Sequence, residues 1–314
     1  MFIVNHRRFF FWLTGLLLLG SIAALVFIPP QLSIEFTGGS LVEVAYTADR
    51  PAQSEIAARV ESLGLEASVR ESGAKGLIVR THALTPAEHD ALVAALSNNG
   101  AQPLTELRFN SIGPSLGQEL ATKALYALGA VTLAIMLYIA WAFRKVSRPV
   151  PAWGYGIISV LMLAIDIIVP AGFFAVYAYF TGAQIDTLFV VALLALMGYC
   201  INDVIVIFDR IREHLKSNEE NKVEESFEKT VGKSITETLG RSINTSLTVA
   251  LALIAIIVFG SESVRTFALV MLVGVVIGTF SSIARSAPLL IPVAAWAEKR
   301  VALRAPENKD TKKA

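Results

Sequence analysis

The chain has 314 residues, of which 54% are hydrophobic and 17% charged, and its mean hydropathy is +0.59. A soluble domain rarely reaches this balance, because its surface must be covered with polar groups. The net charge of +1 gives no indication of a nucleic-acid-binding surface, and the single cysteine, Cys200, excludes an internal disulfide and a metal site built from several cysteines. We therefore expect a membrane protein that binds no nucleic acid, metal or cofactor.

Six apolar stretches are each long enough for a membrane-spanning helix, which needs about 20 residues to cross the hydrocarbon layer. In chain order they are residues 9–28, 124–143, 153–178, 187–208, 242–260 and 266–296. The first is interpreted as an uncleaved anchor, since its apolar run exceeds a signal-peptide core and Val26–Pro30 contains no small-residue cleavage pattern. The last is long enough to tilt or to be broken near Pro288 and Pro292. The pattern predicts an all-α membrane bundle of six helices.

The basic residues predict how the chain is oriented in the membrane. Most Lys and Arg residues lie at the N-terminus, after the second span, in the 209–241 loop and in the 298–314 tail, whereas the loops at 181–184 and 260–265 hold one arginine between them. Short loops rich in Lys and Arg stay in the cytoplasm. Both termini are therefore expected in the cytoplasm and residues 31–122 on the other side. The 209–241 loop is expected to be an amphipathic pair of interfacial helices, or alternatively a docking surface for a partner.

Residues 31–122 have the composition of a soluble domain between the first two spans. The expected elements are strand 40–47, helix 51–63, strands 65–71 and 77–82, helix 85–96 and strand 104–109. Thr85 and Glu88 fit a capping box at the start of the second helix. The βαββαβ order predicts an α+β ferredoxin-like domain on the extracytoplasmic side. The chain is accordingly divided into an N-terminus with the first span, this domain, five further spans with the 209–241 loop, and a tail, at residues 1–30, 31–122, 123–297 and 298–314.

Charged residues inside the spans carry the functional information, because a charge at the centre of a span costs about 2.5–3.5 kcal/mol on translocon scales. Asp166 lies in the middle of the third span. It is either a carboxyl that is neutral or hydrogen-bonded to a neighbouring helix for packing, or a group that takes part in ion movement or gating. Arg285 lies deep in the last span, and the partner considered for it is an acidic residue of a neighbouring subunit.

Asp203 and Arg241 are expected at matching depth on two antiparallel spans. Asp203 precedes Asp209 by about 9 Å of helix, and Arg241 follows Thr236 by about 7.5 Å. A buried carboxylate beside a guanidinium is a suitable proton site, because a change in their separation switches the protonation. The alternative for Arg241 is a side chain that snorkels to the membrane surface at a helix end.

Hydroxyl and amide side chains around Arg241 predict a polar, hydrated seam inside the bundle. Its members are Asn202, Asn244, Thr245, Ser246 and Thr248. Tyr199 and Cys200 are expected to be packing residues. Gly274 and Gly278 form a pair of small residues at helical spacing, which predicts close approach of two helices.

Several segments, in order along nearly the whole chain, resemble the SecF subunits of the SecD–SecF protein-export membrane complex. They are FTGGS at Phe36–Ser40, IGPSLGQEL at Ile112–Leu120, Asp166, AQIDTL at Ala183–Leu188, GYCINDVIVIFDRIRE at Gly198–Glu213, LGRSINTSLT at Leu239–Thr248, and Gly274–Ser282. The segment in the fourth span is highly specific, and the motif of Phe36, Thr37, Gly38 and Gly39 is weaker on its own.

The resemblance implies an accessory factor of the Sec translocon that is driven by the proton motive force across the bacterial inner membrane. The family uses a transmembrane Asp and Arg in proton movement, and these positions match Asp203 and Arg241. It also implies that the six helices are half of an RND-like unit of twelve. The implied partners are a SecD half on another polypeptide, the Sec translocon channel, an unfolded preprotein substrate and the surrounding membrane lipid.

The chain departs from the family pattern at a few positions. Glu35 stands where the family usually has Asp, Val249 replaces a second threonine after Thr248, and Arg285 occupies a position that is usually apolar. The loop between the fourth and fifth spans is also a few residues longer than usual. These departures leave Asp203 and Arg241 in place, and they bear mainly on the packing of the last span.

Two other functions fit parts of the pattern. Half of an RND-type transporter for small molecules or lipids would share the fold and the carboxylate, but it usually has twelve spans and two large outer domains. A purely structural scaffold would hold Asp203 and Arg241 as a static ion pair. The chain is not expected to be an enzyme, because its sequence contains no phosphate-binding glycine loop, nucleophile–base set or metal cluster.

Overall fold

The structure is a computed structural model that describes residues 2–144 and 149–304. Its contacts divide the chain into two compact units. The helical unit comprises Met1–Pro30, Leu128–Ala183 and Leu188–Ala314, and the sheet unit comprises Gln31–Ala127 and Gln184–Thr187. Lys145 and Arg148, which contributed to the predicted orientation, and residues 305–314 of the predicted tail lie outside the described residues.

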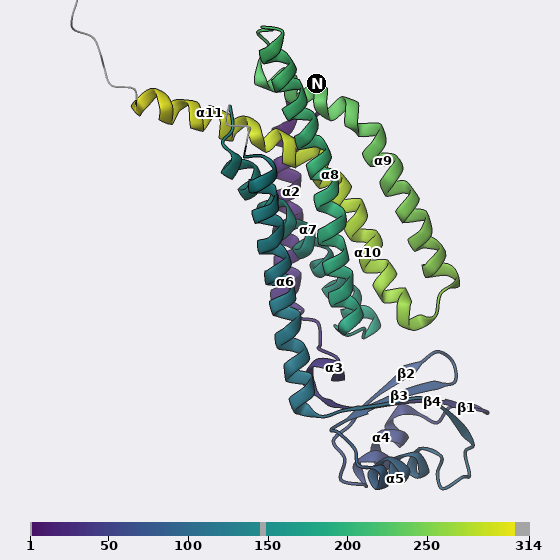
Figure 1. The fold of residues 1–314 in the computed structure, drawn as a ribbon. Coiled ribbons are helices and arrows are strands. Elements are labelled where there is room, and N and C mark those ends of the chain that lie inside the picture. Colours follow the sequence, from purple (N-terminus) through teal and green to yellow (C-terminus); the bar gives the residue numbers. More distant parts are fainter. Residues whose placement is uncertain (1, 145–148, 305–314) are drawn as a thin grey trace, which may run out of the picture. The chain divides into compact units, whose positions relative to one another are not determined.

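Six helical segments of the described chain are long and apolar enough to cross a membrane (Figure 1). They are α2 (Arg7–Phe27), α6 (Pro114–Ala142), α7 (Ala152–Thr181), α8 (Thr187–Glu220), α9 (Phe227–Phe259) and a last span, Val264–Ala297. A short helix, α1 (Phe2–Asn5), precedes α2. Each predicted stretch lies in one of these segments to within one residue, although α6, α8 and α9 extend well beyond it, so apolar length was sufficient to locate the spans but not the helix ends.

Three of the spans form the inside of the helical unit. In the most apolar window of α7, α8 and the last span, 56%, 50% and 56% of the residues are buried, against 6%, 6% and 17% for α2, α6 and α9. The outer three helices therefore expose apolar faces, which suits contact with lipid.

The last span is interrupted by a π-helical turn. It consists of α10 (Glu262–Ser281), the π-helix η1 (Ser282–Ser286) and α11 (Ala287–Arg304). The prediction placed a break near Pro288 and Pro292, and the irregular turn ends two residues before the first of them. Proline lacks a backbone N–H and crowds the preceding turn, and a π-helix is a wider turn that accommodates such a disturbance. All five residues of η1 are buried, including Arg285.

Two glycines bring α10 close to α8, as predicted. A Cβ atom on Gly274 would lie 2.2 Å from Leu196 Cδ1, and one on Gly278 would lie 2.3 Å from Cys200 Sγ. Cys200 is buried in this contact, so its expected packing role is confirmed. A third close approach, which was not predicted from the sequence, joins α7 to α2 where Gly172 contacts Ser21.

Replacing Gly172 by alanine is expected to destabilise the helical unit. The new Cβ atom would lie 2.5 Å from Ser21 Cα and 2.9 Å from its carbonyl oxygen, so the backbones of α7 and α2 must separate. Overpacking of this kind typically lowers the free energy of unfolding by about 1–3 kcal/mol. Thermal unfolding of the purified protein would measure it, with Gly198→Ala as the control, since a Cβ there meets nothing within 4 Å. Equal unfolding midpoints for the two variants would contradict the contact.

The predicted helix pair at 209–241 is continuous with the neighbouring spans. α8 runs on to Glu220 and α9 begins at Phe227, so the expected interfacial pair is an extension of two spanning helices. Arg210 on α8 pairs with Glu237 on α9 at 2.5 Å, and His214 lies 2.9 Å from the same carboxylate. Side-chain partners on both helices thus hold this polar end together.

The sheet unit has the predicted βαββαβ order. Its elements are the short helix α3 (Ile34–Thr37), β1 (Gly39–Tyr46), α4 (Gln53–Glu61), β2 (Ser68–Ser72), β3 (Gly76–Thr81), α5 (Pro86–Leu96) and β4 (Leu104–Ile112). The four strands pair antiparallel in the order β2-β3-β1-β4, which is the ferredoxin-like arrangement. The two long helices of this unit, α4 and α5, lie on one face of the sheet (Figure 1). Their apolar sides and those of the strands form a core of Val42, Val44, Ile56, Val60, Leu77, Val79, Leu92 and Leu96.

The capping box predicted at α5 is present and should make this helix sensitive to acid. The backbone N–H and the hydroxyl of Thr85 both donate to Glu88 at 2.8 Å, and these bonds lower the pKa of Glu88 below 4.5. A lowered pKa means that the ionised carboxylate stabilises the fold above the unfolded pKa, and that this contribution is lost as the pH falls through the folded pKa.

Glu88→Gln should therefore speed hydrogen exchange of the α5 amides relative to the unmodified chain at a pH of about 6, and should have less effect at an acidic pH below the folded pKa of Glu88. Comparing the two proteins at the same pH removes the intrinsic pH dependence of exchange. An equal ratio of rates at both pH values would show that the charge of Glu88 contributes nothing to the cap.

Candidate functional site

Asp203 is a buried carboxylate in the middle of α8. Its exposed fraction is 4%, and within the described residues its Oδ2 atom has no hydrogen-bond partner. Ser242, on the neighbouring helix α9, is the side chain that faces it. The hydroxyl of Ser242 is likewise buried and without a hydrogen-bond partner among the residues that the structure describes. Burying a carboxylate with so few hydrogen-bond partners costs free energy, which indicates a functional reason for its presence.

The two helices are antiparallel and in the register that the sequence predicted. Tyr199 contacts Ser246, Asp203 faces Ser242, and Arg210 pairs with Glu237, so residue numbers fall along α9 as they rise along α8. Arg241 therefore lies at nearly the depth of Asp203, one residue from the serine that faces it.

Arg241 and Asp203 nevertheless form no ion pair in the described structure. Successive residues on an α-helix are rotated by about 100°, so Ser242 points inward while Arg241 lies on the exposed side of α9. The guanidinium of Arg241 interacts with the carboxylate of Asp203 electrostatically, without direct contact. The sequence pattern predicted that the two charged groups face each other directly, and in this conformation they do not.

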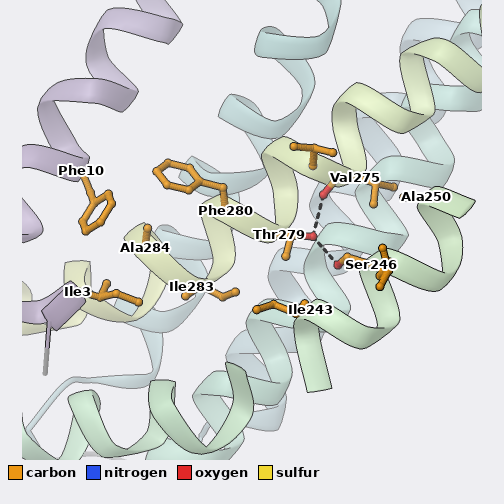
Figure 2. A pocket seen from close by; sticks show the side chains of 12 residues that line it. Ile3, Phe10, Ile243, Ser246, Ala250, Val275, Thr279, Phe280, Ile283 and Ala284 are labelled. Atoms are coloured by element: carbon orange, nitrogen blue, oxygen red, sulfur yellow. Dashed lines mark hydrogen bonds between the residues drawn. The ribbon is translucent and has the colours of Figure 1, made fainter. Parts of the chain in front are cut away.

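A relay of hydroxyl groups connects α8, α9 and α10 next to Asp203. Tyr199 donates to Ser246 at 2.8 Å, and the hydroxyl oxygens of Ser246 and Thr279 are 2.5 Å apart. Figure 2 shows Thr279 hydrogen-bonded both to Ser246 and to the backbone of Val275. Ser246 was predicted in the seam, whereas Tyr199 was expected only to pack and Thr279 was not singled out.

The other predicted seam residues do not face the inside of the helical unit. Asn202, Asn244, Thr245 and Thr248 are exposed in the described chain. The hydroxyls of Thr245 and Thr248 donate to carbonyls of their own helix, at 2.9 Å and 2.8 Å. Together with Arg241 they make a polar strip on the surface of α8 and α9, where contact with lipid would be unfavourable.

Ser246 and Thr279 of this relay also line an apolar groove of about 430 Å³ (Figure 2). It is lined by Ile3, Phe10, Ile243, Ser246, Leu247, Ala250, Val275, Val276, Thr279, Phe280, Ile283 and Ala284. The hydroxyls of Ser246 and Thr279 are its only polar side-chain groups among these residues. An apolar lining offers no ligands to an ion, so this groove does not provide an ion route.

Asp166 has a buried partner in the same chain. Arg285 Nη2, from η1, lies 3.5 Å from Asp166 Oδ1 on α7, and both side chains are 2% exposed. The guanidinium also lies 5.7 Å from the ring centre of Phe280. The sequence predicted no firm partner for Arg285, and the one considered lay on a neighbouring subunit; in the structure η1 turns Arg285 toward Asp166 on α7 of the same chain. Asp166 is thus held in an ion pair, whereas Asp203 is not.

The four residues of the FTGG motif lie in the sheet unit. Phe36 and Thr37 end α3, and Gly38 and Gly39 lead into β1 with φ angles of 76° and 129°. The motif therefore belongs to a different unit of the chain from Asp166, Asp203 and Arg285. Among the described residues, no group of three or more His, Cys, Asp or Glu side chains could hold a metal ion.

The chain is similar to proteins of one family over most of its length. The family model described as "Protein export membrane protein SecD/SecF, C-terminal" matches residues 92–296, and the "SecD/SecF GG Motif" model matches residues 23–49. A protein of Anaerolinea thermophila called "Protein translocase subunit SecF" is 36% identical over 292 residues, covering 92% of each chain. A protein of the same name from Thermobaculum terrenum is 34% identical over 310 residues, covering 95% of this chain and 94% of its own.

Solved structures agree with this assignment. The crystal structure of SecDF from Thermus thermophilus, a translocon-associated membrane protein, matches with a TM-score of 0.78 at 28% identity and covers 94% of this chain. The chain spans 38% of the length of that SecDF chain. The relatives and the six apolar helices indicate a multi-pass membrane protein. The chain belongs to the SecD/SecF family of protein export membrane proteins, and it is of the SecF type.

Proposed function

We propose that the chain is an accessory subunit of the Sec protein translocase that uses the proton motive force to aid preprotein translocation across the bacterial inner membrane. The family match and the names of its relatives support the role in export. The observation that carries the coupling is Asp203, a carboxylate buried in the middle of α8 and lacking an ion-pair partner in the described chain. Asp166, which is equally buried, already has its counter-charge in Arg285.

The position of Arg241 allows two arrangements of the Asp203 and Arg241 side chains, one with the two apart and one with the two in contact. In the described conformation the arginine lies at the same depth but does not touch the carboxylate, a state that suits a protonated, neutral Asp203. An ionised Asp203 would attract the guanidinium, and a small rotation of α9 would bring the two together. Proton binding and release would then bias the separation of α8 and α9. Each charge that crosses the membrane supplies about 2.3 kcal/mol per 100 mV.

A SecD half is the proposed partner of the polar strip on α8 and α9. Arg241, Asn202, Asn244, Thr245 and Thr248 are exposed when the chain is alone, and polar groups of this kind normally face the interior of a membrane bundle. The match covers 38% of the SecDF chain, so more than half of that chain has no counterpart in this one. A second half of RND-like type would cover the strip and complete a path for protons.

The proposed topology places both termini in the cytoplasm and the sheet unit outside it. The basic residues Arg7, Arg8, Arg144 and those of the segment between α8 and α9 support this orientation. In this position the sheet unit would meet the emerging, unfolded preprotein next to the Sec translocon channel.

Export into inverted inner-membrane vesicles tests the proposed function. Vesicles that contain the translocon and a SecD half would be prepared with and without this chain, and preprotein uptake would be measured with an imposed proton gradient and after a protonophore. We expect the gradient to stimulate uptake only in vesicles that contain the chain. Equal uptake in both preparations under both conditions would overturn the proposal.

A further inference from the structure

The segment that contains the FTGG motif is hydrogen-bonded to the first residue of α8. Inside the sheet unit, Glu35 Oε2 accepts two hydrogen bonds from Thr187, one from its backbone N–H and one from its hydroxyl, both at 2.7 Å. Thr187 begins α8. The first N–H groups of a helix have no partner within the helix, and a carboxylate at this end also suits the helix dipole. Glu35 is therefore an external cap on the helix that carries Asp203.

The direction of the Glu35 carboxylate is set by its surroundings. Leu32 and Ile185 form a parallel bridge, in which Ser33 N–H donates to Ile185 O at 2.8 Å and Ile185 N–H donates to Gln31 O at 2.9 Å. The Ser33 hydroxyl accepts from the N–H of Glu35 at 3.2 Å and so caps α3. The backbone on both sides of the contact is thus paired, which limits how far Glu35 and Thr187 can separate.

The same segment is packed against the start of α6 without room for side chains. A Cβ atom on Gly38 would lie 2.7 Å from Pro114 Cα, and one on Gly117 would lie 2.6 Å from the backbone nitrogen of Gly38. On the other side, a Cβ atom on Gly39 would lie 2.6 Å from the carbonyl oxygen of Thr81 in β3. These are contacts with backbone atoms, which cannot move aside as a flexible side chain can.

We propose that residues Glu35–Gly39 form a fixed joint that ties the sheet to the first residues of α6 and α8, and that Glu35 is the positioning residue for α8. This inference rests on the proposed function, because the joint matters for export only if the position of Asp203 matters. Thr187 and Asp203 are on one continuous helix, about 24 Å apart along its axis.

Removing the cap should uncouple export from the proton gradient. Glu35→Ala removes both hydrogen bonds that Thr187 donates and is expected to lower the gradient-stimulated part of vesicle uptake about tenfold or more. Uptake without a gradient and the amount of protein in the membrane should stay unchanged. Glu35→Asp keeps the carboxylate and should restore most of the stimulation. Glu66→Ala, which removes an exposed carboxylate of the same unit, is the control and should behave like the unmodified chain.

A covalent replacement of the cap makes the test specific. With Cys200 replaced by alanine, Glu35→Cys and Thr187→Cys together remove the cap and allow a disulfide in its place. We expect low gradient-stimulated uptake after reduction and recovery after oxidation, because the joint is fixed and does not open during the cycle. Oxidised protein that is no more active than reduced protein, or normal stimulation in Glu35→Ala, would overturn the inference.

A readout independent of export separates this inference from the proposed function. Hydrogen exchange in the first turn of α8 should be faster in Glu35→Ala than in Glu66→Ala if Glu35 caps this helix. If exchange responds but Asp203→Asn exports normally, the proposed function fails while the cap stands. If exchange in the two variants is the same, the cap itself is refuted.

Discussion

Arg285→Gln is expected to lower the free energy of unfolding by about 3–5 kcal/mol, the usual consequence of leaving a buried charge without its partner. Arg285 and Asp166 are each 2% exposed, and their closest charged atoms are 3.5 Å apart. Without the guanidinium, the carboxylate must either stay ionised in an apolar interior or take up a proton. We expect a lower thermal unfolding midpoint and less protein in the membrane.

Removing both charges should recover much of this loss. Asp166→Asn combined with Arg285→Gln leaves two neutral polar groups in contact, and neutral replacements of buried ion pairs are often tolerated. The double variant should therefore be more stable than Arg285→Gln, giving a coupling energy in a double-mutant cycle. Arg265→Gln, the same substitution at an exposed position of α10, is the control and should change stability by less than about 0.5 kcal/mol. Additive effects of the two single changes would show that the pair does not interact.

Asp203→Asn is expected to abolish the gradient-stimulated part of preprotein uptake. Asparagine is nearly isosteric with aspartate but cannot take up or release a proton, so α8 and α9 would be left in one arrangement. Asp203 makes no ion pair in the described structure, and its neutral replacement should not reduce the amount of folded protein.

Asp209→Asn on the same helix provides the matched control. Asp209 is exposed and pairs with Arg212 at 3.1 Å, outside the buried region. Its replacement should leave uptake unchanged with and without a gradient. Normal stimulation by the gradient in Asp203→Asn would favour the purely structural scaffold considered from the sequence.

The sequence predicted those features that depend on local pattern. Apolar length located all six spans, and alternation together with the Thr85–Glu88 cap gave the elements of the sheet unit in the right order. The close approach at Gly274 and Gly278 was also predictable, because small residues at helical spacing leave a gap that a neighbouring helix can fill.

The sequence could not predict which side chains meet across the bundle. Arg285 and Asp166 are 119 positions apart, and their contact depends on the π-helical turn that rotates Arg285 inward. The rotation of α9 that exposes Arg241 and turns Ser242 toward Asp203 depends in the same way on packing. A motif identifies which residues are present, but it does not fix which way their side chains point. A shift of one position along a helix rotates the side-chain direction by about 100° around the helix axis.

The contacts of the FTGG motif were also not predictable from the sequence. Resemblance identified Phe36–Gly39 without giving its role, and the departure from the usual Asp to Glu35 looked minor. Glu35 proves to hold the first residue of α8, and Gly38 proves to lie against the start of α6. These contacts join residues about 80 and 150 positions apart, which local spacing does not reveal.

Proton flux is the most direct test of the central claim that Asp203 couples a proton gradient to movement of the helices. The chain and a SecD half would be reconstituted in vesicles with an internal pH-sensitive dye, and acidification would be followed after a proton gradient is imposed. We predict faster acidification with the unmodified chain and with Asp209→Asn, and none above the level of empty vesicles with Asp203→Asn. Acidification by Asp203→Asn at the rate of the unmodified chain would contradict the account.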